Sequence, residues 1–345
     1  MKRAVALALL GLLAPLLLGI NFIGPRTESN NWTIRIDQRM RAAAARIRGR
    51  KIIFVGGSNL IFGLRAGSLS RRIGLPVVNY GLTAGVGADV IAERASELIG
   101  PDDVVVLATE VVHYPLIEYR NSIRGEFLDY VAREHQLFGL ALARERCTML
   151  REALQKRIMS LRPHYREAPI SPYSLEALGP DGSLRFPRPE NHMAFKVTAP
   201  GLDGSDADFA RSVAARAFVT LQEKCLQRHA TLAVMPPLHL TAPRADASQL
   251  VDRERRWLAL ATADGAVQLL GPGETSLECR FGYDSDYHLN DAGVEIMERR
   301  LATALAWLLK SEAGPQVQWE RMAAPNGGAK VMQASIKSSA LGAGK

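Results

Sequence analysis

Short, uninterrupted apolar runs recur along this chain and alternate with stretches of helical periodicity. A strand that is apolar at every position is buried on both faces of its sheet, whereas a half-exposed strand alternates apolar and polar residues. Buried strands that alternate with helices are typical of a parallel sheet covered by helices on both faces. The strand-like runs are residues 51–55, 75–79, 103–107, 230–234 and 267–270.

Helical patterns lie between these runs, at residues 88–99, 209–228 and 250–263, and a last one follows at 291–309. We therefore predict an α/β fold with a doubly wound, mostly parallel five-stranded sheet. In such sheets, functional groups lie in the loops at the carboxyl ends of the strands. The residues directly after each apolar run are accordingly the first candidates for a functional site.

The ends and the middle of the 345-residue chain depart from this alternation. Residues 25–50 include a basic, alanine-rich helical pattern that precedes the α/β domain, which we place at 51–312. Residues 119–209 hold helical pieces and a proline-rich passage, and are predicted to form an insertion in that domain. Residues 313–345 mix Gly, Ala, Ser, Lys and Pro without periodicity, and are predicted to form a disordered tail.

The chain begins with a basic pair, Lys2 and Arg3, followed by an uncharged apolar stretch from Ala4 to Gly24. A helix needs about 20 such residues to span a bilayer. Because no Ala-x-Ala cleavage site follows, we predict that residues 1–24 form an uncleaved transmembrane anchor, with a cleaved secretion signal as the alternative. The basic pair then places the N-terminus in the cytoplasm and the remaining chain outside it.

Charge and cysteine content narrow the classes of function. Lys and Arg number 43 against 35 Asp and Glu, a net charge of +8, but the arginines are scattered and often lie beside acidic residues. This distribution does not support binding to nucleic acid. The three cysteines, Cys147, Cys225 and Cys279, match no metal or redox spacing and would form either one disulfide or three buried thiols. No His, Asp or Glu grouping has metal-ligand spacing, so we predict no metal and no cofactor.

The first candidate for chemistry is Ser58, which follows Gly56 and Gly57 at the end of the first apolar run. A serine on a tight turn at a strand end exposes its hydroxyl group near backbone N–H groups, and this placement suits a nucleophile. The alternatives are a helix cap and a phosphate-binding turn, as in a nucleotide-binding protein. No phosphate-loop or dinucleotide-binding pattern supports the second alternative.

The second candidate is His288, which lies between the last apolar run and the last helical pattern. Asp284 and Asp286 precede it by four and two residues, so either carboxylate could orient the imidazole as a general base. The alternative is a surface loop in which Asn290 or Asp291 caps the following helix. Because Ser58 and His288 both follow strand ends, they are expected to project from the same edge of the sheet.

With these two candidates, the sequence resembles the SGNH (GDSL-type) hydrolase superfamily. Its nucleophilic serine follows the first strand, and an Asp and a His share a motif near the C-terminus. Ser58 in Gly-Gly-Ser-Asn matches the serine block, and His288 in Tyr-His-Leu-Asn-x-x-Gly matches the histidine block. The resemblance implies a flavodoxin-like SGNH fold, and an oxyanion hole formed by the N–H groups of Ser58 and of Gly85 in the glycine block at residues 79–87.

The chain departs from the pattern of this family at three positions. Gly57 stands where many members have an aspartate, and Glu110 stands where the family places an asparagine that donates to the oxyanion. The third oxyanion donor is therefore open. The family acid usually lies three residues before the histidine, where this chain has Ser285. The triad acid is then Asp284 or Asp286, with a slight preference for Asp284.

The variant motifs are similar to those of a membrane-anchored subgroup related to exopolysaccharide O-acetyltransferases. This resemblance implies an extracytoplasmic serine esterase or O-acyltransferase, expected to handle acetyl groups on an envelope or secreted polysaccharide. It also implies a single-pass protein of the bacterial inner membrane with its domain in the periplasm. Its partners would be a membrane-bound acyltransferase or the polysaccharide export machinery. Weaker candidates for substrate contact are Asn59, Glu110, His113, Tyr114 and His239.

An alternative from another class is a non-catalytic carbohydrate-binding or assembly subunit on a degenerate SGNH fold. Glu110 at the position of an oxyanion donor favours this alternative, because an ionised carboxylate cannot donate a hydrogen bond. The separation between the Ser58 hydroxyl group and the His288 ring distinguishes the two hypotheses. A large separation would support the binding subunit.

Overall fold

The structure is a computed structural model in which the chain divides into two units, residues 1–35 with 119–175 and residues 36–118 with 176–345. The described residues are 28–110, 113, 123, 124, 127, 128, 130, 131, 177–185, 187–189, 211–241, 247–285 and 287–312. The predicted anchor at 1–24, the predicted tail from 313 and most of the predicted insertion lie outside them. Within the described part, no helix is both long and apolar enough to span a membrane.

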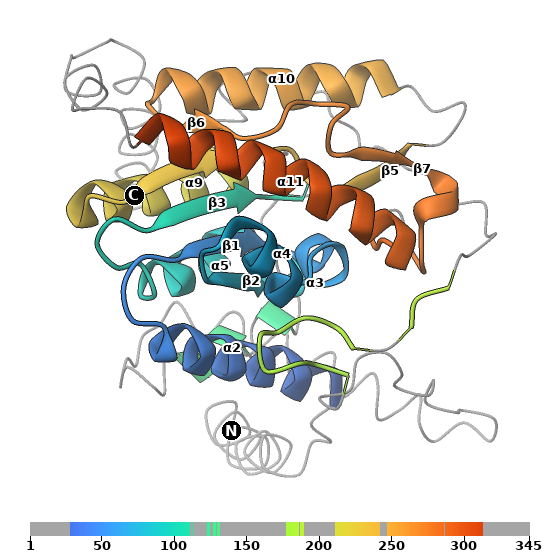
Figure 1. Cartoon of the computed structure of the whole chain (residues 1–345), viewed down its shortest axis with the longest axis horizontal. Coiled ribbons are helices and arrows are strands. Elements are labelled where there is room, and N and C mark those ends of the chain that lie inside the picture. Colours follow the sequence, from blue (N-terminus) through green and yellow to red (C-terminus); the bar gives the residue numbers. More distant parts are fainter. Residues whose placement is uncertain are drawn as a thin grey trace, which may run out of the picture. The chain divides into compact units, whose positions relative to one another are not determined.

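A parallel five-stranded sheet forms the centre of the second unit (Figure 1). Its strand order is β2-β1-β3-β4-β6, and every neighbouring pair is parallel. The strands are β1 (Ile52–Gly56), β2 (Val77–Gly81), β3 (Val104–Ala108), β4 (Thr231–Val234) and β6 (Val267–Gln268). Each of the five predicted runs overlaps one of these strands, so the predicted α/β class and parallel sheet are confirmed.

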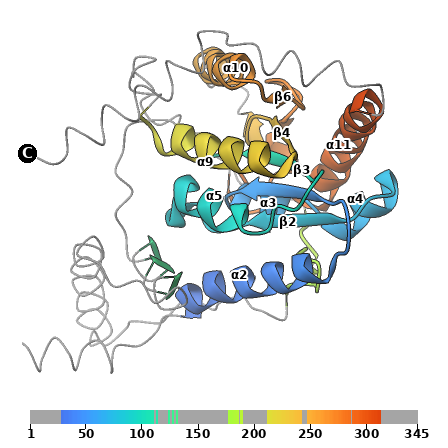
Figure 2. The same ribbon diagram turned by 90° about the vertical axis from the view of Figure 1, so that its left-hand side faces the viewer.

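Helices cover both faces of this sheet (Figure 2). On one face lie α3 (Ser58–Gly63), α4 (Ala66–Ile73) and α11 (Asp291–Glu312). On the other face, α5 (Ala88–Ser96) packs against α9 (Val213–Arg228). The other helices of the described chain are α2 (Glu28–Arg46), η1 (Ala84–Val86), α10 (Ala247–Ala263) and η3 (Cys279–Phe281).

The two faces of the central strands explain why their sequences are apolar without interruption. Ile52 and Phe54 on β1 are buried in one cluster with Leu301 and Leu305 of α11. Because side chains alternate along a strand, Ile53 points to the opposite face, which α5 and α9 cover, and it is also fully buried. Removal of apolar surface from water on both faces is the main stabilising contribution of such a sheet.

Helix α9 begins later than the sequence predicts, at Val213 instead of residue 209. The Ser212 hydroxyl group accepts a hydrogen bond from the N–H of Ala215 at 3.1 Å, and this cap sets the first turn. The helix ends at Arg228, and the next residue, His229, has a φ of 55° in the left-handed region that terminates helices. A second, two-stranded parallel sheet, β5 (His239–Thr241) with β7 (Ser276–Glu278), was not predicted.

The strand order places a topological switch point beside β1. From β1 the chain moves to its neighbour β2 on one side and later returns as β3 on the other side. A crevice forms at such a point, at the carboxyl ends of the strands, and open α/β sheets bind their ligands there. At this edge Gly56 pairs with Ala108, so the residues that follow β1 and β3, Ser58 and Glu110, emerge next to each other.

Helix α10 carries a fully buried carboxyl group, that of Glu254. Burial raises the pKa of Glu254 to about 8 from an ordinary value of 4.5. The folded chain therefore keeps this proton at pH values where the unfolded chain has lost it. The resulting contribution to stability is fully present below about pH 4.5 and is lost as the pH rises toward about 8.

We expect Glu254→Gln to flatten this decline in the free energy of unfolding between pH 5 and pH 8, because the amide does not titrate. Urea unfolding at several pH values measures the effect. Glu278→Gln, at an exposed carboxylate, is the matched control and should leave the slope unchanged. A slope in Glu254→Gln as steep as that of the unsubstituted chain would contradict the prediction.

Candidate active site

Ser58 is the first residue of helix α3. Gly56, the last residue of β1, and Gly57 precede it. A Cβ on Gly56 would lie 2.4 Å from the carbonyl oxygen of Ala108, so the close approach of β1 and β3 requires a glycine. A Cβ on Gly57 would lie 2.3 Å from Oε1 of Glu110. The two glycines therefore leave room for the β3 edge and for the carboxylate beside the serine.

The hydroxyl of Ser58, the imidazole of His288 and the carboxylate of Asp284 form a continuous line of hydrogen bonds. Ser58 Oγ lies 2.9 Å from His288 Nε2, and His288 Nδ1 lies 2.5 Å from Asp284 Oδ1. In the tautomer that fits these contacts, Nδ1–H donates to the carboxylate and Nε2 accepts from the hydroxyl group. This arrangement activates a serine for attack on a carbonyl carbon.

The spacing of four residues between Asp284 and His288 follows from the fold of their loop. The N–H of Tyr283 donates to the carbonyl oxygen of His288 at 2.8 Å, and the N–H of His288 approaches the carbonyl oxygen of Ser285 at 3.4 Å. The loop therefore closes on itself and brings residue 284 beside the ring of residue 288. Asp286, the other acid that the sequence offers, lies outside the described residues.

Asn290 anchors this loop to helix α11. Its N–H donates to Phe281 at 2.8 Å, its side-chain amide donates to Arg280 at 2.8 Å, and its Oδ1 accepts from the N–H of Gly293 at 2.9 Å. Asn290 therefore caps α11, as the alternative interpretation of this motif predicts, and holds the histidine loop at the same time. A Cβ on Gly293 would lie 2.9 Å from the Phe281 carbonyl oxygen, which explains the glycine of the motif.

The ring of Phe62 supports the imidazole from one side. The two ring centroids are 3.8 Å apart and the planes are inclined by 14°. Phe62 lies in α3, four residues after Ser58, so one short helix carries both Ser58 and the aromatic side chain that contacts His288. Tyr283 stacks on Phe62 at 6.2 Å, and burial together with the charge of Asp284 raises the pKa of Tyr283.

Glu110 follows β3 and its buried carboxylate faces the first turn of α3. Its Oε1 accepts a hydrogen bond from the N–H of Asn59 at 3.0 Å and lies 3.2 Å from Ser58 Oγ. The single hydroxyl proton of Ser58 therefore has two acceptors, Glu110 Oε1 and His288 Nε2. Glu110 fixes the serine turn, and the asparagine donor of the SGNH pattern is replaced here by an acceptor.

The predicted oxyanion donors lie on the turns after β1 and β2. Within the described residues, the N–H of Ser58 donates no hydrogen bond, so it is available to a ligand. Gly85 lies in the 3₁₀ turn η1, and His113 Nε2 lies 3.0 Å from the carbonyl oxygen of its neighbour Ala84. The loop after β3 thereby contacts the turn that carries Gly85.

The weaker candidates for substrate contact occupy different environments. The side chain of Asn59 is fully buried, with its amide 3.5 Å from the carbonyl oxygen of Ala108. His113 is buried against η1, and the backbone of His239 forms the start of β5. Tyr114 lies outside the described residues. Substrate contact by these four residues and by Glu110 stays a prediction.

Sequence reasoning did not identify the contribution of Arg188, which is almost fully buried. Its guanidinium group donates to the carbonyl oxygen of Phe62 at 2.6 Å and to Asp291 Oδ1 at 3.2 Å. Burial lowers the pKa of Arg188, and the Asp291 carboxylate opposes this shift. Arg188 thus ties the end of α3 to the first turn of α11. No local pattern reveals it, because its partners lie 126 and 103 residues away in the sequence.

Comparisons with protein-family models, with curated proteins and with solved structures gave no match. Among the described residues, no group of three or more His, Cys, Asp or Glu side chains is placed to hold a metal ion. The functional groups that the structure does bring together are the hydroxyl group of Ser58, the imidazole of His288 and the carboxylates of Asp284 and Glu110.

Proposed function

We propose that this protein is a serine-dependent acyl-ester hydrolase or O-acyltransferase of the SGNH type. The single observation that carries the proposal is the line of hydrogen bonds from Ser58 through His288 to Asp284. A nucleophile, a base and an orienting acid in contact at the switch point of a parallel sheet support acyl transfer more than binding alone. The separation of 2.9 Å between Ser58 Oγ and His288 Nε2 favours an enzyme over the non-catalytic alternative.

The proposed reaction has two halves. Ser58 Oγ attacks the ester carbonyl carbon while its proton passes to His288 Nε2, and the N–H of Ser58 stabilises the oxyanion, with Gly85 as the proposed second donor. The alkoxide leaves with the proton from His288, and an acyl-serine remains. Water or a sugar hydroxyl group then attacks the acyl-serine while His288 accepts its proton; the bond between the acyl carbon and Ser58 Oγ breaks, and His288 returns the proton to Ser58 Oγ. Hydrolysis and transfer share the acyl-enzyme and differ only in the second nucleophile.

The proposed assignment to the SGNH superfamily extends to fold, location and substrate. The strand order β2-β1-β3-β4-β6 is the flavodoxin-like order, with the nucleophile after the first strand and the base before the last helix. The membrane anchor at 1–24, the periplasmic location and the polysaccharide substrate come from the sequence and its resemblance. A non-catalytic carbohydrate-binding subunit is the second candidate, favoured by Glu110 Oε1 at 3.2 Å from Ser58 Oγ.

A serine-reactive fluorophosphonate probe tests the catalytic proposal. We expect the full-length chain to be labelled once, at Ser58, and the Ser58→Ala variant to remain unlabelled while it unfolds at a similar temperature. Release of acetate from a model ester should be lost in the same variant. A folded chain with neither labelling at Ser58 nor Ser58-dependent acetate release would favour the binding subunit and contradict the enzyme.

A further inference from the structure

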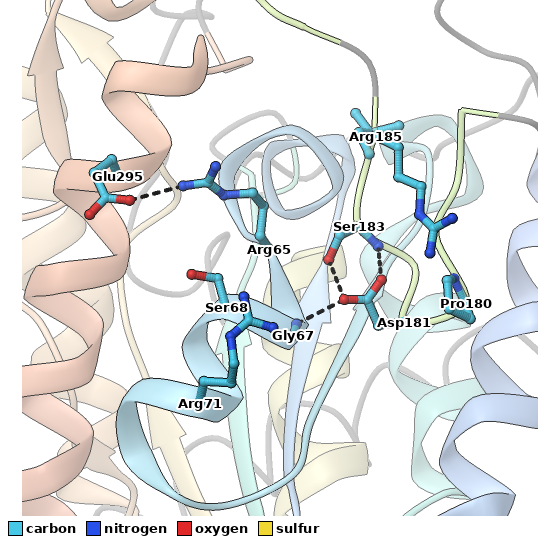
Figure 3. A pocket seen from close by; sticks show the side chains of 10 residues that line it. Arg65, Gly67, Ser68, Arg71, Pro180, Asp181, Ser183, Arg185 and Glu295 are labelled. Carbon is cyan, nitrogen blue, oxygen red and sulfur yellow. Dashed lines mark hydrogen bonds and ion pairs between the residues drawn. The ribbon is translucent and has the colours of Figure 1, made fainter.

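A cavity of about 490 Å³ lies beside α4, residues 180–185 and α11, and Ser58, Asp284 and His288 do not line it (Figure 3). Its lining includes three arginines, two carboxylates and two serines. The charged residues among them are Arg65, Arg71, Arg185, Asp181 and Glu295. Positive charge therefore exceeds negative charge in this cavity.

The three arginines differ in what they already bind. Arg65 donates to Glu298 at 2.9 Å and to Glu295 at 3.0 Å, and the hydrogen bond to Glu298 is the main cause that raises its pKa. The guanidinium groups of Arg71 and Arg185 form no hydrogen bond or ion pair within the described residues, and both side chains are exposed. Two guanidinium groups thus remain available to a ligand.

The carboxylates of the cavity are already engaged with other groups. Asp181 accepts from the N–H of Gly67 at 2.9 Å, from the N–H of Ser183 at 3.2 Å and from its hydroxyl group at 3.0 Å. These neutral donors hold Asp181 at the start of α4, between the side chains of Arg71 and Arg185 in this view (Figure 3). The carboxylate of Glu295 forms ion pairs with arginines, among them Arg65.

We infer that this cavity is a second, non-catalytic site that binds the anionic group of an acidic glycan. A guanidinium group suits a carboxylate, phosphate or sulfate, because it offers paired N–H donors to two oxygens. Around these groups, Ser68 and Asp181 offer polar partners for sugar hydroxyl groups. The inference rests on the proposed function and names the class of its substrate.

An acidic glycan fits the cavity better than an anionic membrane surface does. The lining mixes arginines with serine and carboxylate oxygens, which can accept hydrogen bonds from the hydroxyl groups of a sugar. Surface-bound proteins usually add apolar side chains that enter the bilayer. The large exposed hydrophobic residues of the described chain, Leu226 and Trp307, do not line the cavity, and Leu184 in its lining is buried.

The cavity and the site at Ser58 are joined by two chain segments, α3 and the segment that ends at Arg188. Ser58 and Gly63 are the ends of α3, a six-residue helix, and Arg65 follows two residues later. At about 1.5 Å per residue, α3 spans roughly 8 Å. The segment that lines the cavity continues to Arg188, which contacts Phe62 under the catalytic imidazole. A glycan of several sugars anchored at Arg71 and Arg185 could therefore extend toward Ser58.

Calorimetric titration of the full-length chain tests this site, with hexagalacturonate, a sulfated dextran oligomer and a neutral dextran oligomer of similar length as probes. We expect the acidic oligomers to bind and the neutral one to bind at least tenfold more weakly. The double variant Arg71→Gln/Arg185→Gln should lose at least tenfold in affinity for the acidic oligomers. Arg228→Gln/Arg255→Gln removes the same charge at exposed arginines outside the cavity and should bind as the unsubstituted chain does.

Several outcomes would overturn the inference. The first is that neither acidic oligomer binds, and the second is that the two double variants lose equal affinity for them. The third is that inorganic sulfate competes at the same concentration as the oligomer, which would indicate a simple ion site. Binding of phosphatidylglycerol vesicles, lost in the Arg71/Arg185 variant while no glycan binds, would assign the cavity to a membrane.

Cleavage of p-nitrophenyl acetate should be unchanged in the Arg71/Arg185 variant. If glycan binding persists but fluorophosphonate does not label Ser58, the proposed enzyme fails and the binding site stands.

Discussion

Replacing Asp284 by asparagine is expected to lower the rate of ester cleavage about 10³–10⁴-fold at neutral pH. Asp284 Oδ1 accepts the Nδ1–H of His288 at 2.5 Å and so selects the tautomer whose Nε2 faces Ser58. An asparagine can present its NH₂ group to Nδ1, and the ring then carries its proton on Nε2, where it cannot accept the serine proton. The substitution also removes the charge that stabilises the imidazolium ion.

Asp286→Asn is the matched control, because it removes the other acid that the sequence places near the histidine. We expect it to retain a rate within a few-fold of the unsubstituted chain, as measured by kcat for a model acetyl ester. Thermal unfolding of both variants shows whether a lower rate results from the lost charge or from loss of the folded structure. A large loss in Asp286→Asn with a small loss in Asp284→Asn would transfer the role of the acid to Asp286.

Gly57→Ala is expected to lower the rate at least about tenfold and to destabilise the fold by about 1–3 kcal/mol. The backbone of Gly57, with φ of −90° and ψ of −157°, is accessible to alanine, so the cost is steric. The nearest atoms to the new Cβ are Oε1, Cδ and Cγ of Glu110, at 2.3, 2.6 and 3.1 Å. The carboxylate must move, and it then leaves the N–H of Asn59 and the hydroxyl group of Ser58.

A double-mutant cycle isolates this contact. Glu110→Ala alone should destabilise the chain by about 1–3 kcal/mol, because the N–H of Asn59 loses its acceptor. In the Glu110→Ala background, Gly57→Ala should cost less than about 0.5 kcal/mol, since all three obstructing atoms are gone. Urea unfolding measures the four free energies. Equal costs of Gly57→Ala in both backgrounds would show that Glu110 is not the reason for the glycine.

The sheet and the shared edge of Ser58 and His288 could be predicted because they depend on local signals. An apolar run is visible without its neighbours, and parallel strands bring their carboxyl ends to one edge. The strands β5 and β7 could not be predicted, because each has three residues and depends on pairing with a distant segment. A three-residue segment is too short to show a period of its own.

The surroundings of Ser58, His288 and Asp284 depend on contacts that no local pattern encodes. The sequence shows that Glu110 departs from the SGNH pattern, but only the fold shows that its carboxylate fills the space a Gly57 side chain would need. In the sequence, Phe62 is indistinguishable from an ordinary core residue. Its contact with His288 joins two parts of the chain that are distant in sequence. Specific packing of this kind is decided when the elements assemble, after their local structure is determined.

The double role of Asn290 couples the chemistry of the site to the integrity of one helix. The same side chain satisfies the first turn of α11 and holds the loop that carries His288. Fraying of that turn would release the loop, because helix ends and loops open at lower free energy than the core of a fold. In the proposed enzyme, loss of activity on warming would then begin with local opening of this loop, with His288 displaced from Ser58 while the parallel sheet is still intact.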